Sequence, residues 1–193
     1  DDLILGTRKG MCIRFNERHI RTMGRISMGV HAMRLDEDDE IIDMCPLNVG
    51  SEVLAITALG YGKRTSPEEY REQGRNGKGI RAMNLTDKTG EMAALLMVNP
   101  EEDLLLITDE GTIIRTRVAD IRLCGRNTQG VRIMKLQEGS RVVGVARADK
   151  EEETPDTVDD DLREETPLNV PVEEAGLDMD VGGEEVAPEE PEI

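Results

Sequence analysis

The chain has 193 residues, with 24 Lys and Arg against 41 Asp and Glu, and a formal net charge of −17. The charge is unevenly distributed, because residues 1–150 carry 23 basic and 23 acidic residues, whereas residues 151–193 carry 1 basic and 18 acidic residues. We therefore interpret the chain as a charge-balanced body followed by an acidic tail. One Phe, two Tyr and no Trp argue against recognition of single strands by base stacking on exposed aromatic side chains.

The cysteine spacing argues against a disulfide framework or a cysteine-based metal site, and the short apolar runs argue against a membrane-spanning helix. Cys12, Cys45 and Cys124 are far apart and form no Cys-x-x-Cys pair or His-flanked cluster, which is typical of reduced, buried thiols in a cytosolic protein. No signal peptide is recognisable, and no apolar run approaches the roughly 20 residues of a membrane-spanning helix. The chain begins with Asp1 and lacks an initiating Met, so we expect it to be a piece of a longer protein.

A twelve-residue pattern occurs three times in the body of the chain. Each copy contains Gly-Arg, three residues, Gly, a β-branched residue, two residues, Met, one residue and Leu. The copies begin at Gly24, Gly74 and Gly125, so they are spaced by 50 and then 51 residues. A fixed period in this range predicts a repeat architecture.

The segments between the copies keep the same period and predict short strands. The expected first strands are 3–7, 53–57 and 104–108, the second are 11–15, 61–65 and 112–116, the third begin at Val30, Ile80 and Val131, and the fourth are near 41–44, 93–98 and 142–146. Glycines at 10, 60 and 111 predict tight reversals between the first two strands. Each repeat thus has four short strands and no long helix, which is typical of propeller-type blades. We divide the body into blades of about 1–49, 50–100 and 101–150.

The connecting segments and the tail complete the expected fold. Ser66-Pro67-Glu68-Glu69 predicts one short helical turn. An apolar residue recurs after this point of each repeat, at Ile20, Tyr70 and Ile121, and we expect it to anchor the segment in the core. Residues 151–193 lose the period and are rich in Pro, Glu and Asp, so they predict a disordered acidic tail.

Basic residues are concentrated in three parts of the body that follow the repeat. Residues 8–35 hold seven basic residues and one acidic residue, residues 63–85 hold six and three, and residues 111–136 hold six and one. The compensating acids gather at 36–43 and 101–110. This segregation favours a binding face, whereas the alternative is that the arginines only pair with neighbouring acids and solvate the fold.

Several arginines recur in register. The sets are Arg14, Arg64 and Arg115; Arg21, Arg71 and Arg122; Arg25, Arg75 and Arg126; and Arg81 with Arg132, whose place His31 takes in the first repeat. The first set lies within predicted strands, so we expect it to be structural. The others would lie at equivalent points of successive blades and form a basic track along the rim. Such a track holds the phosphates of duplex DNA without reading bases, and loop glycines would let backbone amides approach the same phosphates.

The three repeats resemble the blades of the C-terminal DNA-wrapping domain of the DNA gyrase A protein, a β-pinwheel, over residues 1–150. The seven-residue gyrase A box of that family reads Gln-Arg-Arg-Gly-Gly-Lys-Gly, and residues 73–79 read Gln-Gly-Arg-Asn-Gly-Lys-Gly. The loops at 23–29 and 124–130 keep only the central Arg and the final Gly. Together, the box and the recurring arginines predict DNA binding by Arg21, Arg25, Arg71, Gln73, Arg75, Gly77, Lys78, Gly79, Arg81, Arg122, Arg126, Arg132 and Lys135.

The resemblance implies an intact domain of about six blades, of which this chain would be the C-terminal part. It implies that the domain bends DNA around its rim to support ATP-dependent negative supercoiling. Its partners would be the DNA-cleaving core of gyrase A and the ATP-driven gyrase B protein, in an A2B2 assembly in the bacterial cytoplasm, at the nucleoid. The cleavage tyrosine, ATP and Mg²⁺ would belong to other parts of that assembly, so we expect no catalytic residue, cofactor or metal site and no membrane contact in this chain.

Other functions stay open at this point. The equivalent domain of topoisomerase IV would have fewer and more degenerate blades without a true box. A protein-binding propeller would use the same basic rim for acidic partners. An independent enzyme is the weakest alternative, because no nucleophile–base pair, metal-ligand cluster or phosphate loop followed by a helix is present. The acidic tail would either compete with DNA for the rim or serve only to keep the protein soluble.

Overall fold

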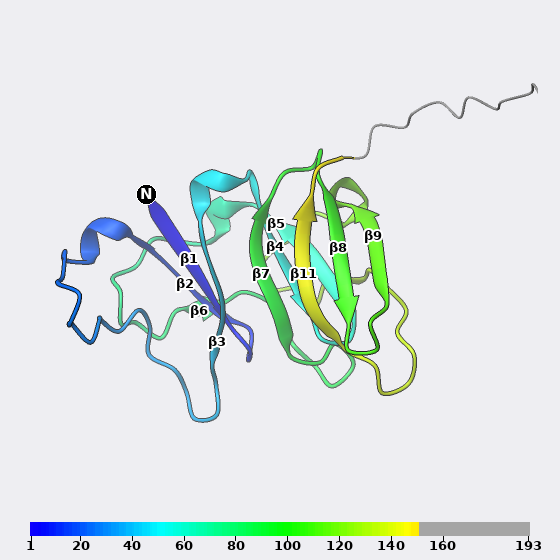
Figure 1. The fold of residues 1–193 in the computed structure, drawn as a ribbon, viewed down its shortest axis with the longest axis horizontal. Coiled ribbons are helices and arrows are strands. Elements are labelled where there is room, and N and C mark those ends of the chain that lie inside the picture. Colours follow the sequence, from blue (N-terminus) through cyan, green and yellow to red (C-terminus); the bar gives the residue numbers. More distant parts are fainter. Residues whose placement is uncertain (151–193) are drawn as a thin grey trace, which may run out of the picture. The chain divides into compact units, whose positions relative to one another are not determined.

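The computed structural model describes residues 1–150, and the predicted acidic tail at 151–193 lies outside the described residues. Residues 1–150 contain eleven β-strands, four short 3₁₀ turns and no α-helix (Figure 1). The prediction of an all-β fold is therefore confirmed. No helix in this part of the chain is long and apolar enough to cross a membrane.

The strands form three antiparallel sheets. The first contains β1 (Asp2–Thr7), β2 (Met11–Asn16), β3 (Ile41–Pro46) and β6 (Ile80–Arg81), the second β4 (Glu52–Thr57), β5 (Tyr61–Thr65), β7 (Met92–Val98) and β10 (Val131–Arg132), and the third β8 (Asp103–Thr108), β9 (Ile113–Arg117) and β11 (Val142–Ala148). Their orders are β3-β1-β2-β6, β10-β5-β4-β7 and β11-β8-β9. The 3₁₀ turns are η1 (Glu17–His19), η2 (Leu47–Val49), η3 (Pro67–Glu69) and η4 (Val118–Asp120).

The third strand of a repeat does not stay in its own sheet. β6 belongs to the second repeat but pairs with β2 of the first, with Cys12 opposite Ile80. In the same way β10 of the third repeat pairs with β5 of the second, with Gly62 opposite Val131. Figure 1 shows β6 beside β2, away from β4 and β5. The strands predicted for one repeat are therefore distributed over two sheets, because strand periodicity does not indicate which sheet accepts a strand.

The equivalent segment of the first repeat forms no strand. The expected third strand at Val30 is replaced by irregular backbone, and only Met33 makes an isolated bridge, to Gly77. β6 and β10 each pair with a strand of the sheet before their own. Within residues 1–150 the segment at Val30 has no such strand to pair with. β9 is likewise an edge strand of a three-stranded sheet.

The predicted anchor residues are buried where the chain passes from one repeat to the next. Tyr70 is fully buried and Ile121 is 2% exposed, while Ile20 packs partly buried against Phe15 and Met33. Burial of side chains of this size stabilises the fold by about 1.5–3 kcal/mol each. The expected anchoring of the connecting segments is thus confirmed.

The in-strand arginines join neighbouring repeats. Arg14 pairs with Asp2 at 2.6 Å and donates to the carbonyl of Tyr70 at 3.2 Å. Arg64 repeats this arrangement, because it pairs with Glu52 at 2.7 Å and donates to the carbonyl of Ile121 at 2.6 Å. The expectation that these arginines are structural is therefore confirmed.

The third member of this set also makes an in-sheet ion pair. Arg115 lies 2.7 Å from Asp103, in the same register as the pairs of Arg14 and Arg64. The guanidinium of each in-strand arginine thus neutralises a carboxylate on the neighbouring first strand. In Arg14 and Arg64 the remaining nitrogens hold the 3₁₀ turn of the following repeat.

The cysteines are free thiols, as expected, but only Cys12 is buried, whereas Cys45 and Cys124 are half-buried. Burial raises the pKa of Cys12 to about 12 and that of Cys45 to about 11. Both thiols are therefore neutral at physiological pH and pack as small apolar groups.

We predict that Arg64→Ala destabilises the protein by about 3–5 kcal/mol. The substitution leaves the carboxylate of Glu52, whose side chain is only 16% exposed, without its partner and frees two backbone carbonyls. Urea unfolding measures this change. Lys78→Ala is the control, because its pair with Asp36 is two-thirds exposed and is worth about 0–1 kcal/mol. Equal losses in the two variants would contradict the structural role of Arg64.

Candidate nucleic-acid interface

The Gly-Arg loop of the second repeat lies along the first repeat. The amide of Gln73 donates to the carbonyl of Arg14 at 2.8 Å, and the amide of Arg34 donates to the carbonyl of Gly77 at 2.8 Å. The loop of the third repeat is held in the same way, because Cys124 donates to the carbonyl of Arg64 at 2.9 Å. Each loop is therefore positioned by backbone contacts with the repeat before it.

The final glycines of the second and third loops permit the crossing to the preceding sheet. Gly79 has φ +77°, and a Cβ there would lie 2.2 Å from the carbonyl oxygen of Cys12. Gly130 has φ +73°, and a Cβ would lie 2.5 Å from the carbonyl oxygen of Gly62. The structure shows that both glycines are required for close packing against β2 and β5, and an approach of loop amides to phosphates stays a prediction.

Two of the three loop arginines reach back to the preceding repeat. Arg75 donates to the carbonyl of His31 at 3.2 Å and to that of His19 at 3.0 Å. Arg126 donates to the carbonyl of Arg81, the residue equivalent to His31. Both arginines are half-buried, so part of each guanidinium is engaged in joining repeats.

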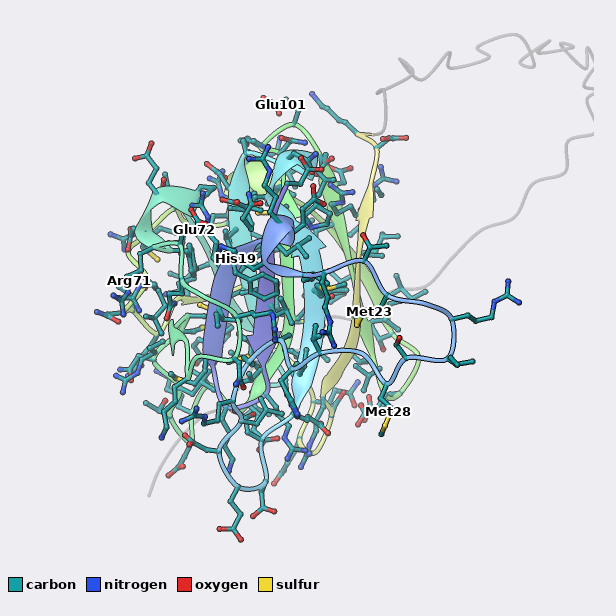
Figure 2. All side chains as sticks on the ribbon, turned by 90° about the vertical axis from the view of Figure 1, so that its left-hand side faces the viewer. His19, Met23, Met28, Arg71, Glu72 and Glu101 are labelled. Atoms are coloured by element: carbon teal, nitrogen blue, oxygen red, sulfur yellow. The ribbon has the colours of Figure 1, made fainter. Side chains whose placement is uncertain are left out.

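Arg25 differs from these two arginines. It is exposed and makes no hydrogen bond or ion pair within residues 1–150. Its loop extends away from the strands, and Met28 is fully exposed (Figure 2). Within residues 1–150 the same sequence pattern therefore gives two environments.

The arginines that follow the anchor residues form the clearest exposed set. Arg21, Arg71 and Arg122 come directly after Ile20, Tyr70 and Ile121, so burial of the anchor turns the next side chain outward. All three are exposed, and their guanidinium groups have no hydrogen-bond or ion-pair partner within residues 1–150. Figure 2 shows Arg71 at the surface beside Glu72. Their charges are therefore available to an anionic partner.

The other predicted residues occupy varied positions. Lys78 lies 3.2 Å from Asp36 in an exposed pair, Gly77 bridges to Met33, and the side-chain nitrogen of Gln73 is buried without a partner among residues 1–150. Arg81 and Lys135 are exposed. Arg132 donates to the hydroxyl of Tyr61 at 3.0 Å. The predicted residues therefore do not form one uniform surface.

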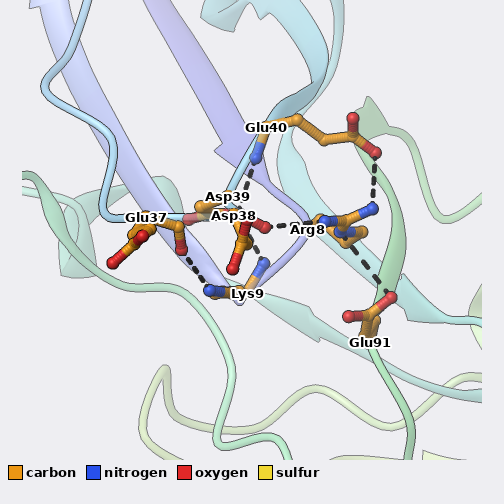
Figure 3. A network of polar contacts seen from close by, with 7 residues as sticks. All are labelled: Arg8, Lys9, Glu37, Asp38, Asp39, Glu40 and Glu91. Atoms are coloured by element: carbon orange, nitrogen blue, oxygen red, sulfur yellow. Dashed lines mark hydrogen bonds and ion pairs between the residues drawn. The ribbon is translucent and has the colours of Figure 1, made fainter.

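Two basic residues that we counted toward the binding face contact the acidic turn after Leu35. Arg8 donates to Glu40 at 3.1 Å and lies 3.7 Å from Glu91, and it also donates to the carbonyl of Asp38 at 2.6 Å (Figure 3). Lys9 donates to the carbonyl of Glu37. The acidic turn thus folds onto these two cations, and the local charge of residues 8–35 overstates the free positive charge. For Arg8 the alternative of simple ion pairing is correct.

Sequence reasoning missed a buried cation beneath the third loop. Lys63 is fully buried, and its ammonium donates to the carbonyls of Gly125 at 2.9 Å, Thr128 at 3.2 Å and Arg126. Burial in this site lowers the pKa of Lys63 to about 8. The first and third repeats have Ile13 and Ile114 at this position. The lysine at a position that is apolar in the other repeats was therefore the sequence feature that could have indicated a buried cation.

No cluster of three His, Cys, Asp or Glu residues that could hold a metal ion occurs within residues 1–150. The repeated sheets, exchanged strands and exposed in-register arginines define a blade-type repeat protein with a segmented basic surface. A family model for the DNA gyrase C-terminal domain, a β-propeller, matches residues 1–46, 51–99 and 102–149. The chain belongs to this family, and the predicted β-pinwheel blades are confirmed.

Individual relatives agree with the family match. The chain is 43% identical over 162 residues to the DNA gyrase A protein of Campylobacter fetus, covering 82% of this chain and 19% of that protein. It is 41% identical over 155 residues to the DNA gyrase A protein of Staphylococcus epidermidis (strain ATCC 12228 / FDA PCI 1200), covering 79% and 17%. The chain thus spans about a fifth of the length of these relatives.

Two solved structures share the fold at 23% sequence identity. A DNA gyrase A C-terminal domain superposes with a TM-score of 0.72, covering 77% of this chain and 50% of that chain. The C-terminal domain of a DNA topoisomerase IV also superposes with a TM-score of 0.72, covering 77% and 47%. The fold therefore does not separate these two kinds of enzyme.

We predict that Gly79→Ala destabilises the protein by about 1–3 kcal/mol more than Gly29→Ala. Both glycines have positive φ, so both alanines carry a similar backbone strain. Only at Gly79 does the new Cβ collide with the backbone of β2, whereas no atom lies within 4 Å of a Cβ at Gly29. Urea unfolding of the two variants measures the difference. Equal destabilisation would show that the crossing is not tightly packed.

Proposed function

We propose that the chain is a non-catalytic module that binds duplex DNA and wraps it along its basic surface. The observation that carries the proposal is the set of Arg21, Arg71 and Arg122, which are exposed, unpaired within residues 1–150 and equivalent in successive repeats. Arginine binds phosphate oxygens through a planar fork of donors, and phosphate contacts position a duplex without reading its sequence. Membership of the DNA gyrase C-terminal domain family supports the same function.

We further propose that the module acts as part of a DNA gyrase in a bacterial cytoplasm, at the nucleoid. Its partners would be the gyrase A core and the gyrase B protein in an A2B2 assembly, and DNA cleavage, ATP and Mg²⁺ would belong to those parts. The gyrase names of the relatives at 41–43% identity and the box-like residues 73–79 favour this assignment. The topoisomerase IV domain of equal TM-score supports the second candidate, an equivalent role in that enzyme. Measuring the supercoiling and decatenation activities of the reconstituted enzyme distinguishes the two candidates.

The DNA-binding proposal is tested by the triple variant R21Q/R71Q/R122Q. If each arginine neutralises one phosphate, the slope of log affinity against log salt becomes shallower by about 2.7, and affinity at 0.15 M salt falls roughly 100-fold. Fluorescence polarisation with a labelled duplex between about 50 and 200 mM salt measures both quantities. Urea unfolding verifies that the variant stays folded.

The matched control for this experiment is R8Q/K9Q/R117Q, which removes the same net charge from cations that contact acidic residues or the acidic turn. We expect a much smaller loss of affinity in the control. Equal losses would show that net charge, and not the in-register surface, governs binding. Wild-type affinity that does not change with salt would contradict phosphate binding altogether.

We extend the proposal to the acidic residues 151–193. Eighteen carboxylates tethered to the same chain compete with DNA for the exposed arginines through a high effective concentration. A chain that ends at residue 150 is therefore expected to bind duplex DNA more tightly, with the largest gain at low salt, where screening is weakest. The polarisation assay measures this gain. Unchanged affinity would leave the acidic segment only a solubilising role.

A further inference from the structure

A basic cavity lies at the hairpin end of the second sheet. Its volume is about 400 Å³, and it lies where the turn between β4 and β5 meets the segment after β10. Tyr61 and four cations line it, namely Lys88, Arg132, Lys135 and Arg141. We call these five residues the Tyr61 pocket. Of them, only Arg132 and Lys135 were expected to bind DNA.

The phenol of Tyr61 is held between two of the cations. Arg132 donates to its hydroxyl oxygen at 3.0 Å, and the Arg132 guanidinium lies 5.5 Å from the ring centroid. The ammonium of Lys88 lies 5.8 Å from the same centroid. Because the hydroxyl oxygen accepts from Arg132, the hydroxyl proton is free to be donated to a ligand oxygen. The hydrogen bond and the charge of Arg132 lower the pKa of Tyr61, which shows that the pocket stabilises negative charge.

The positive charge of the pocket exceeds the negative charge beside it. None of its four cations makes an ion pair with any residue between 1 and 150. One carboxylate, that of Asp109, reaches this region, where it accepts from the hydroxyl of Ser140 at 3.1 Å and from the amide of Arg141 at 2.9 Å. Four like charges around one cavity repel one another, and a bound anion relieves that repulsion.

The pocket is not a general feature of the repeat. At the junction between the first and second sheets, the equivalent residues are Met11, Asp38, Arg81, Asn84 and Gly90. That set contains one cation and one acid in place of four cations and a phenol. The backbone pairing is the same, because Met11 lies opposite Arg81 as Tyr61 lies opposite Arg132. The basic pocket is therefore specific to the second junction and is not required for strand exchange.

The pocket adjoins the Gly-Arg loop of the third repeat. Tyr61 and Lys63 lie two residues apart on β5, so their side chains are on the same face, about 7 Å apart along the strand. Lys63 holds the carbonyls of that loop, while Arg132 of β10 extends from the loop into the pocket. A duplex in contact with the loop therefore has a further cationic cavity beside it.

We propose that the Tyr61 pocket binds a phosphate group of the DNA backbone next to the third Gly-Arg loop. This inference rests on the proposed DNA-binding function and adds a defined contact to it. A backbone phosphate presents two charged oxygens, which suit the fork of Arg132 together with the lysine ammonium groups and the phenol proton. A carboxylate presents the same number of oxygens, so the donor groups alone do not separate the two anions. Phosphate is assigned because the pocket adjoins the third Gly-Arg loop, where the proposed function places the duplex.

The double variant K88Q/K135Q in the 193-residue chain tests the proposal. It leaves the contact between Arg132 and Tyr61 intact, and Lys88 and Lys135 are exposed, so the fold is retained. If both lysines contribute to binding this one phosphate, the salt slope becomes shallower by about 0.9 and affinity for a labelled duplex at 0.15 M salt falls roughly 5-fold. The control K9Q/K150Q removes two lysines elsewhere and is expected to lose much less affinity. Equal affinities of the two double variants overturn the proposal.

A second measurement reports on the pocket itself. The chain has two tyrosines and no Trp, and burial raises the pKa of Tyr70, so the phenol of Tyr61 titrates first in an absorbance titration. Tripolyphosphate, which does not absorb, is added as the probe. Cations lower the pKa of Tyr61 by stabilising the phenolate, so a bound anion raises that pKa. We expect the upward shift in the wild type and its loss in K88Q/K135Q.

The two measurements distinguish the possible ligands. A shift with tripolyphosphate, together with the selective loss of DNA affinity in K88Q/K135Q, supports the proposal. A tripolyphosphate shift with unaltered DNA affinity overturns it and indicates a site for free phosphate compounds. A shift with polyglutamate but not with tripolyphosphate overturns it in favour of an acidic peptide. Loss of DNA binding in R21Q/R71Q/R122Q but not in K88Q/K135Q overturns only this inference, whereas a wild type that binds no duplex overturns the proposed function.

Discussion

The structure depends on the backbone crossing by which each repeat places a short strand on the sheet before it. At Gly79 and Gly130 the chain passes so close to β2 and β5 that no side chain fits, and both residues have positive φ. The crossing aligns β6 and β10 with their acceptor strands and thereby links the first sheet to the second and the second to the third. Arg14 and Arg64 strengthen the same joints through the following 3₁₀ turns.

The crossing also determines which basic residues are available. Because the Gly-Arg loops lie on the preceding repeat, Arg75 and Arg126 donate to its carbonyls and are half-buried. The residue after each buried anchor turns outward instead, which exposes Arg71 and Arg122 at equivalent places. The positive surface is therefore a consequence of how the repeats are joined, and the most conspicuous arginines of the sequence pattern are not its most exposed ones.

Individual residues show how far sequence reasoning extends. The period predicted the first, second and fourth strands, the turns at Gly10 and Gly60 and the burial of Tyr70 and Ile121, because these depend on local alternation and spacing. The contacts of Arg8 and Lys9 with an acidic turn about 30 residues away were not predictable, since composition counts charges without their contacts. Nor was the Tyr61 pocket, whose members come from three segments of the chain.

The sequence by itself determined the all-β class, the period of the repeats and the family, because these are written in spacing, glycine placement and hydrophobic alternation. Only the tertiary structure decided which sheet accepts each third strand, since alternation along a strand does not identify its neighbour and the crossing requires the close packing at Gly79 and Gly130. The same long-range packing separated arginines that hold the repeats together from arginines that remain open to a partner. Arginine side chains form a binding surface only where the fold leaves them without a partner in the protein.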